Sequence, residues 1–223
     1  MKKIAALIFA ALVFSFAQTA CLAQDGDKTL QTVQLSKPNL DKGAPLMQAL
    51  KNRKSDRNIS EEKLTPQQLS EILWAADGMN RETGKRTAPS SMGKYGVDIY
   101  AVLEEGIYKY DVKNHALEPV AAGDYRSLAG TQDFVYTAPL NLIYVADVVK
   151  NNPNAKTDGS PQELSWAYIE AGHQAQNVYL YCASEGLGVV ARAMMKKEEL
   201  SKTMSLKPGQ VILYSQTVGH IKK

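Results

Sequence analysis

Two segments far apart in the chain carry the residue types that bind phosphate. One reads Arg53-Lys54-Ser55-Asp56-Arg57, and the other reads Val218-Gly219-His220-Ile221-Lys222-Lys223. Guanidinium and ammonium donors suit a phosphate dianion, because hydrogen bonds to an ionised acceptor are about twice as strong as neutral ones. If the turn at Arg53 is helical, Arg53 and Arg57 project on one side, with the Ser55 hydroxyl as a further donor. If the fold brings the two segments together, we expect one anion site.

Taken alone, each segment is also typical of solvated surface. Basic residues at the end of a helix are favoured by the negative end of its dipole, and terminal lysines usually face water. The interpretation of the two segments as a phosphate site therefore depends on what the rest of the sequence, between them, indicates.

Residues 1–23 have the pattern of a secretory signal peptide. A basic start at Lys2 and Lys3 precedes an uncharged run from Ile4 to Ala17, which is too short for a comfortable membrane span. Cleavage after Ala23 would leave 200 residues, and we expect export to the periplasm with no integral membrane span.

An alternative makes Cys21 a lipidated N-terminus. Thr19 and Ala20 would then belong to the lipobox, although Gln18 occupies the place where an aliphatic residue is expected. Processing after Ala23 and anchoring at Cys21 both export the protein.

Charge and cysteine content exclude some classes of function. The chain has 26 basic and 23 acidic residues, and loss of Lys2 and Lys3 with the signal leaves 24 against 23, a net charge of +1. We therefore expect no nucleic-acid partner. Cys182 would be the only cysteine of the processed chain, in an apolar helical stretch. We expect a buried thiol; a reactive nucleophile is the alternative, but no neighbouring His or Lys lowers its pKa.

The processed chain divides into an arm and one domain. Residues 24–44 are polar, without a strong period, and read as a linker, either a tether or a wrapping arm. Residues 45–223 form one α+β domain. A short helix is expected to begin at Pro45. Three further helices are expected from Pro66 to Gly78, from Pro161 to Glu185 and from Glu198 to Leu206. Its expected strands cover 97–103, 107–111, 139–147 and 210–217.

The order of these landmarks, from about Leu46 to the C-terminus, resembles the nitroreductase family of flavin enzymes. Within it, the chain resembles the branch that includes the azoline-oxidising dehydrogenases of peptide-antibiotic maturation. The resemblance rests on five elements in order: Arg53-x-Ser55-x-Arg57, LSEILWAADGMN over 69–80, Arg86-Thr-Ala-Pro89-Ser90-Ser91, Glu185-Gly-Leu-Gly188, and Gln216-Thr-Val-Gly219 followed by Lys222-Lys223.

The resemblance implies a fold, a cofactor and a reaction class. The fold is a central, mostly antiparallel sheet flanked by helices, in a homodimer with two sites at the subunit interface. The cofactor is non-covalent FMN, which would pass hydride or electrons through its N5 atom to or from a small-molecule substrate, with ping-pong kinetics. The implied cofactor contacts are Arg53, Ser55, Arg57, Pro89, Ser90, Ser91, Met92, Arg192, Gly219 and Lys222.

Two positions depart from the commoner pattern of the family. The stretch from Val189 to Ala193 stands where many relatives have Pro and then Gly near the flavin. Arg192, in this stretch, either tunes the flavin from its pyrimidine edge or is a surface arginine before the next helix. Gly93 stands where nitroaromatic-reducing relatives carry an asparagine that bonds the ring.

Export complicates the choice of electron donor. NADH and NADPH are not expected outside the inner membrane, and no GxGxxG fingerprint is present. An unknown donor feeds the flavin, or the enzyme oxidises its substrate. No protein nucleophile is required, and the spacing of His115, His173 and His220 predicts no metal site. The alternative function is an exported binding or assembly protein that keeps the dimeric fold without activity.

Overall fold

The computed structural model describes residues 29–156 and 160–223. The expected signal peptide and the first residues of the arm lie outside the described residues. No helix among those described combines the length and the apolar character needed to cross a lipid bilayer.

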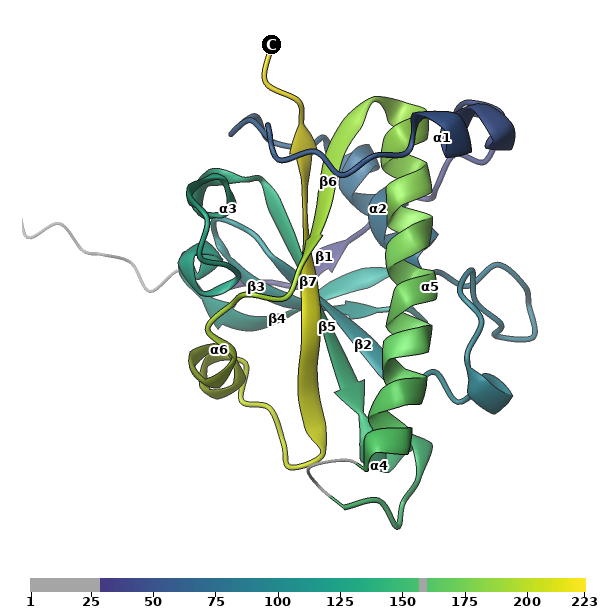
Figure 1. Cartoon of the computed structure of the whole chain (residues 1–223), viewed down its shortest axis with the longest axis vertical. Coiled ribbons are helices and arrows are strands. Elements are labelled where there is room, and N and C mark those ends of the chain that lie inside the picture. Colours follow the sequence, from purple (N-terminus) through teal and green to yellow (C-terminus); the bar gives the residue numbers. More distant parts are fainter. Residues whose placement is uncertain (1–28, 157–159) are drawn as a thin grey trace, which may run out of the picture.

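The core of the fold is a seven-stranded sheet in which all neighbouring strands are antiparallel (Figure 1). The strand order is β1-β4-β3-β2-β5-β7-β6. The strands are β1 (Val33–Gln34), β2 (Val97–Val102), β3 (Gly106–Asp111), β4 (Ala116–Ala122), β5 (Leu140–Asp147), β6 (Leu187–Arg192) and β7 (Gln210–His220). The expected α+β class with a mostly antiparallel sheet is confirmed.

Six α-helices and two short 3₁₀ turns complete the described part of the chain. They are α1 (Leu46–Asn52), α2 (Pro66–Asp77), η1 (Ser91–Gly93), η2 (Arg126–Leu128), α3 (Asp133–Thr137), α4 (Val148–Asn151), α5 (Pro161–Glu185) and α6 (Lys197–Thr203). Both α2 and α5 begin with a capping box and a proline in the first turn. The bounds expected for α5 match the structure, and the helix ends at Gly186, which has a φ of 70°.

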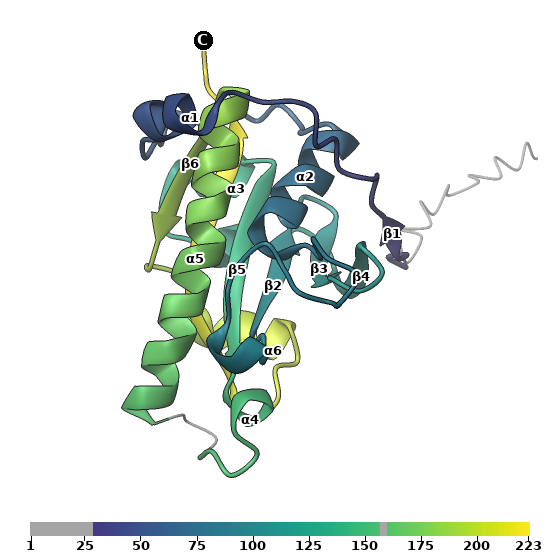
Figure 2. The same ribbon diagram turned by 90° about the vertical axis from the view of Figure 1, so that its right-hand side faces the viewer.

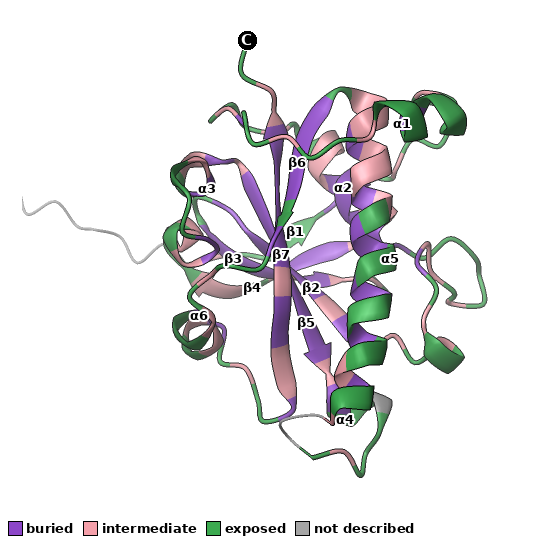
Figure 3. Cartoon of the chain, viewed as in Figure 1, coloured by how far each residue is buried: buried purple, intermediate pink, exposed green. Residues whose placement is uncertain are grey.

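Helices cover both faces of the sheet. Side chains alternate along each strand, so each strand contributes residues to the core on both faces. In β5, Leu142 and Tyr144 join the core under α2 and α5, whereas Ile143 and Val145 join the core under α6. Figures 1 and 2 show α5 along one face and α3 and α6 on the other. The buried residues follow the strands between these layers, while the outward side of α5 is largely exposed (Figure 3).

The described part of the arm packs against the domain. Its strand β1 pairs with β4 at the edge of the sheet, and Leu35 is buried. Further along, Lys42 forms ion pairs with Glu71 of α2 at 2.8 Å and Glu185 of α5 at 2.6 Å. The arm therefore wraps the domain and covers an edge that would otherwise expose unpaired backbone groups.

Three strands, β1, β4 and β6, were not expected from the sequence, and β1 lies in the stretch that was expected to be a linker. Pro119 interrupts the β4 pattern, and proline usually argues against a strand. The pairing of β3 with β4 shifts register between Ile107 and Tyr108, and Pro119 lies just beyond this irregularity, opposite Tyr108. Strand β6 follows α5 after the single residue Gly186, and only its pairing with β7 identifies it.

Candidate functional site

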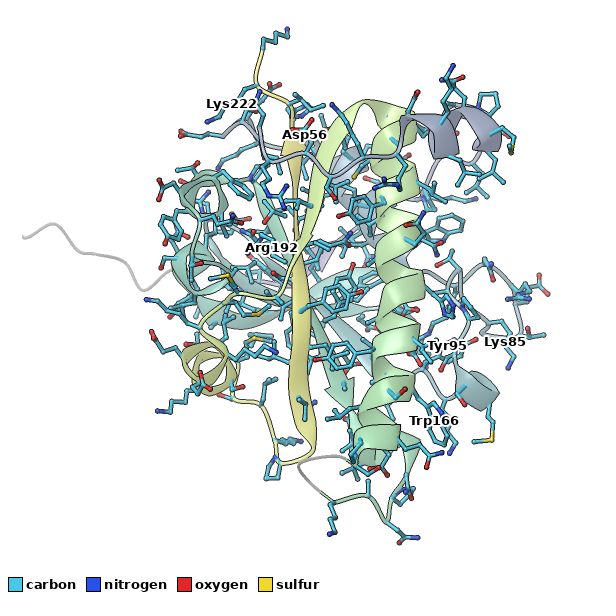
Figure 4. The ribbon with its side chains drawn as sticks, viewed as in Figure 1. Asp56, Lys85, Tyr95, Trp166, Arg192 and Lys222 are labelled. Atoms are coloured by element: carbon cyan, nitrogen blue, oxygen red, sulfur yellow. The ribbon has the colours of Figure 1, made fainter. Side chains whose placement is uncertain are left out.

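The fold brings the two basic segments together. The N–H of Lys222 donates to the carbonyl of Asn58 at 2.8 Å, and the Asn58 side chain donates back to the Lys222 carbonyl at 3.2 Å. Ile59 and Ile221 form an antiparallel bridge beside this pair. Figure 4 shows Asp56 and Lys222 at the same end of the molecule. We call residues 53–57 and Lys222 the basic cluster.

The helical turn assumed for Arg53 to Arg57 is wrong. Helix α1 ends at Asn52, and Arg53 has φ −56° and ψ 120°. The N–H of Asp56 then donates to the carbonyl of Val189 in β6 at 2.9 Å. Backbone pairing with β6 therefore sets the course of this segment, and a tertiary contact overrides the local pattern.

Tyr179 of α5 organises the basic cluster. Its hydroxyl lies 2.9 Å from the Ser55 hydroxyl and accepts the backbone N–H of Ala191 at 2.8 Å. The Arg53 guanidinium lies 5.4 Å from the centre of the Tyr179 ring, within cation–π range. This tyrosine was not predicted, because 124 residues separate it from Ser55 and no local pattern joins them.

The charges of the cluster suit a phosphate. Lys54 pairs with Asp56 at 2.9 Å, and this contact, with the N–H of Asn58, lowers the pKa of Asp56. Among the residues that the structure describes, no carboxylate lies within ion-pair distance of Arg53, Arg57 or Lys222. Arg53, Arg57 and Lys222 are therefore cations without an acidic partner in the described part of the chain, and with the Ser55 hydroxyl they are of the donor types that a phosphate dianion prefers.

The loop with the predicted flavin-edge residues is tied to α5 by Glu170. The Ser90 hydroxyl donates to the buried Glu170 carboxylate at 2.5 Å and accepts the N–H of Tyr95 at 2.8 Å. The other Glu170 oxygen accepts the N–H of Val97 at 3.1 Å. One carboxylate on α5 thus fixes both ends of the segment from 90 to 97.

The outer part of this loop has a constrained backbone. Met92, Gly93 and Tyr95 have φ values of 52°, 68° and 50°, in the left-handed region that most side chains avoid. Pro89, Ser91 and Met92 are exposed. Among the predicted contacts in this loop, the side chains of 89, 91 and 92 are therefore presented outward, while the Ser90 hydroxyl is turned toward α5.

A buried acid and an arginine hold the start of the loop. Arg86 pairs with Asp77 of α2, and its guanidinium lies 4.3 Å from the centre of the Tyr95 ring. Burial raises the pKa of Asp77 to about 7, and its Oδ1 atom has no hydrogen-bond partner in the described part of the chain. Both residues lie in segments that carry the resemblance, but neither was among the predicted cofactor contacts.

A hollow of about 240 Å³ lies between the loop and α5. The loop contributes Pro89, Ser90 and Ser91, and α5 contributes Trp166 and His173 among others. Figure 4 shows Trp166 on the same side of α5 as Tyr95. The hollow is large enough for part of a ligand, and the rest of the ligand would extend outside it.

Arg192 is buried, so the surface-arginine alternative is wrong. It is 8% exposed, and its three nitrogens donate to Thr217 Oγ1 at 2.9 Å, the Ala129 carbonyl at 2.8 Å and Asn141 Oδ1 at 3.1 Å. Burial lowers its pKa to about 10. The guanidinium therefore cross-links β5, β6 and β7 through neutral acceptors.

Gly219 lies buried within β7, opposite Gly188. A Cβ atom there would come within 2.7 Å of Ile59 and 2.8 Å of Pro139. Close packing alone thus accounts for glycine at 219, and its contact with a cofactor stays a prediction.

The basic cluster and the loop lie on opposite sides of α5. Tyr179, which holds the cluster, and Glu170, which holds the loop, are nine residues apart on this helix. Nine residues correspond to about 14 Å and two and a half turns, so the two side chains point in opposite directions. Within one chain the two groups of predicted contacts therefore do not share a face of α5.

Comparison with known proteins identifies relatives of the whole domain. The Nitroreductase family model matches residues 50–220. A curated protein of Methanocaldococcus jannaschii, provisionally named a nitroreductase, is 31% identical over 192 residues, which cover 82% of this chain and 94% of that protein. A crystal structure from Ralstonia eutropha JMP134, also provisionally described as a nitroreductase, has a TM-score of 0.79 at 41% identity and covers 86% of this chain and 90% of that chain.

More distant structures share the fold. A chain of the E. coli microcin synthetase McbBCD complex, with truncated pro-MccB17 bound, has a TM-score of 0.64 at 21% identity, covering 95% of this chain and 85% of that chain. The NADPH:FMN oxidoreductase of Vibrio harveyi has a TM-score of 0.59 at 19% identity, covering 80% and 69%.

Proposed function

The chain belongs to the nitroreductase family and is a flavin-dependent oxidoreductase, and from that premise we propose that its flavin is FMN, held at two sites of a homodimer. The substrate is a small molecule that the enzyme oxidises or reduces. When bound, FMN would supply hydride transfer at its N5 atom, in a ping-pong exchange between a donor and an acceptor.

The observation that carries the proposal is the basic cluster. Arg53, Arg57 and Lys222 come from two segments joined by backbone pairing, and the acid between them, Asp56, is already neutralised by Lys54. An FMN phosphate would accept hydrogen bonds from the two arginines, the lysine and Ser55. Riboflavin, which lacks the phosphate, would leave these cations unpaired.

Other residues of the chain position and shield the ring. The Glu170 contacts fix the loop, so that Pro89, Ser91 and Met92 face outward in a set arrangement. The N–H of Ala191 donates to Tyr179, so a backbone donor for the flavin would come from another residue. Each of the three guanidinium nitrogens of Arg192 already donates a hydrogen bond to a protein acceptor. The role we propose for Arg192 is therefore to stiffen the strands beside the flavin ring.

A second subunit would complete each site. Because the cluster and the loop lie on opposite sides of α5, the loop of one subunit would meet the cluster of the other when two α5 helices pack together. The exposure of Trp166 (43%), Ile169 (55%) and Met92 (77%) supports a partner that covers this side. Sedimentation of the purified protein tests this step: a dimer is expected, and Ile169→Glu should yield monomers.

Cofactor content tests the proposal directly. The purified chain should be yellow or become so with FMN, and Arg57→Ala combined with Lys222→Ala should lower FMN affinity at least about 100-fold, because the phosphate loses two charged donors. Riboflavin affinity should change little. The matched control, Lys202→Ala with Lys207→Ala, removes two exposed lysines elsewhere and should retain FMN. A chain that stays colourless with FMN contradicts the proposal and favours the non-enzymatic alternative.

Export of the protein and the identity of its electron donor are proposals that rest on the sequence alone. If residues 1–23 direct export, the donor is a quinone-linked or protein partner, or the enzyme acts as a dehydrogenase. Steady-state reduction of the bound flavin by NADPH, NADH or a reduced quinone distinguishes these cases.

A further inference from the structure

A second cavity, which we call the arm pocket, lies beneath the N-terminal arm. Its volume is about 450 Å³, within the range of ligand-binding pockets. Its walls come from the arm over 34–40, from the end of α2 with the residues that follow it, and from the turn between β3 and β4. It shares no residue with the basic cluster or with the predicted flavin-edge residues.

The walls of the arm pocket are largely apolar. Leu35, Pro38, Leu40, Trp74, Met79 and Val112 line it. Leu40 is 68% exposed and Met79 is 38% exposed, so large apolar side chains remain uncovered at the mouth. The indole of Trp74 supplies a flat surface, which suits a ring system.

The charge of the arm pocket is positive. Lys37 and Lys113 line it, and no carboxylate does. Within 29–156 and 160–223, neither lysine has an ion-pair partner. Burial lowers the pKa of the third basic residue, His115, so the positive charge at neutral pH comes from the lysines.

The pocket is preformed. The His115 ring bonds Tyr110 and Ser70, each at 2.8 Å. The arm is fixed beside it, because the N–H of Leu35 donates to the His115 carbonyl at 3.1 Å and Gln67 donates to the Lys37 carbonyl at 3.0 Å. A ligand would therefore meet walls that need little ordering on binding.

We propose that the arm pocket binds a small amphipathic anion, with an aromatic body against Trp74 and a carboxylate or sulfonate that reaches Lys37 and Lys113. Apolar walls select the body, and Lys37 and Lys113 select the charge; Lys113 feels the nearby Asp111 carboxylate, but neither lysine is in an ion pair within the described residues. The site is independent of the flavin.

Fluorescence of Trp74 tests this site. The chain has two tryptophans, so Trp166→Phe leaves Trp74 as the only one. Anilinonaphthalene sulfonate is a suitable anionic probe, and phenylnaphthylamine, which lacks the sulfonate, is its neutral counterpart. We expect one saturable site per chain, with energy transfer from Trp74 to either probe. Lys37→Ala with Lys113→Ala should weaken sulfonate binding about tenfold and change neutral-probe binding less than about twofold.

The controls separate the arm pocket from other sites. Lys202→Ala with Lys207→Ala should leave both affinities unchanged. Saturating FMN should not displace the probe, and the double variant Arg57→Ala, Lys222→Ala should bind it normally; displacement by FMN would overturn the proposal. If FMN fails to bind while the probe still does, the flavin proposal falls and the arm pocket stands.

Three further results would overturn the proposal. One is the absence of energy transfer from Trp74. Another is an equal loss of both probes in the lysine variant, which would show that charge selects nothing. The last is probe binding that vanishes as protein concentration rises, which would show that a second copy of the chain occupies the pocket.

Discussion

The hydroxyl groups of Tyr179 and Ser55 lie 2.9 Å apart, and this contact ties the longest helix to the basic segment that follows α1. The same tyrosine hydroxyl accepts the N–H of Ala191. A single side chain on α5 therefore sets the spacing between the basic cluster and the end of β6.

Tyr179→Phe should weaken FMN binding about tenfold and destabilise the protein by about 1 kcal/mol. The change removes the hydroxyl and leaves the ring beneath Arg53. Flavin titration and urea unfolding measure the two effects. Tyr168→Phe is the control, since Tyr168 lies exposed on the same helix and should change neither value. Unaltered affinity in Tyr179→Phe would show that Ser55 needs no support.

Glu170→Gln should loosen the segment from 90 to 97. The amide group replaces an acceptor of the Ser90 hydroxyl with a donor, which competes with the N–H of Tyr95. We expect amide hydrogen exchange across this segment to accelerate about tenfold, equivalent to about 1.4 kcal/mol. Glu198→Gln, at an exposed position in α6, should leave exchange unchanged. Equal exchange in both variants would contradict the role of Glu170.

Because of Asp77, we expect the free energy of unfolding to fall as the pH rises. Burial raises its pKa from 3.8 to about 7, so the folded state binds the proton more tightly than the unfolded state. Its contribution to stability is complete below pH 3.8 and is lost as the pH rises to about 7, at up to about 1.4 kcal/mol per unit.

Asp77→Asn stays neutral and keeps an acceptor for Arg86. Relative to the natural chain, it should gain free energy of unfolding as the pH rises from about 4 to about 8. Urea unfolding across this range provides the measurement, and Asp41→Asn, at an exposed position, is the control. Parallel curves for the natural chain and Asp77→Asn would refute the assignment.

Gly93→Asn should be tolerated. Asparagine adopts positive φ more readily than most residues, and the nearest atom to an added Cβ is the flexible Lys85 Nζ, at 2.6 Å. We expect a cost below about 1 kcal/mol, against about 2 kcal/mol for Gly93→Val, because β-branched residues avoid this region. Thermal unfolding compares the two variants, and an equal cost would mean that space, not φ, decides at this position.

Local chemistry explains which elements were predictable. Helix α5 has an N-cap serine, a first-turn proline and a glycine stop, all within the helix or beside it, and its bounds follow from the sequence. The hairpin of β2 and β3 likewise follows from alternation, and the buried strand β5 follows from a continuous, largely apolar run. Strand β4 contains a proline, and β6 is as long as β2 and β3 but does not alternate, so each is identified only by its pairing with a neighbouring strand.

The site was predictable as a list of residues, but not as an arrangement. Basic types and spacing marked Arg53, Arg57 and Lys222, and the structure brings their segments together. Tyr179, which holds Ser55, and Glu170, which holds the loop at Ser90, lie 124 and 80 residues from these serines, and no period in the sequence links such distances. The burial of Arg192 likewise depends on three strands at once.

Strand β7 is the last strand in chain order, yet it lies between β5 and β6. Strand β6 pairs with no other strand in the described sheet, so it has no edge to join until residues 210–220 have been synthesised. The basic cluster also cannot form before this strand has been synthesised, because Lys222 follows it in the chain. Until residues 210–220 have been added, the growing chain would therefore hold an incomplete sheet with an open edge at β5. Chains with such an unpaired edge are prone to aggregate or to be bound by a chaperone.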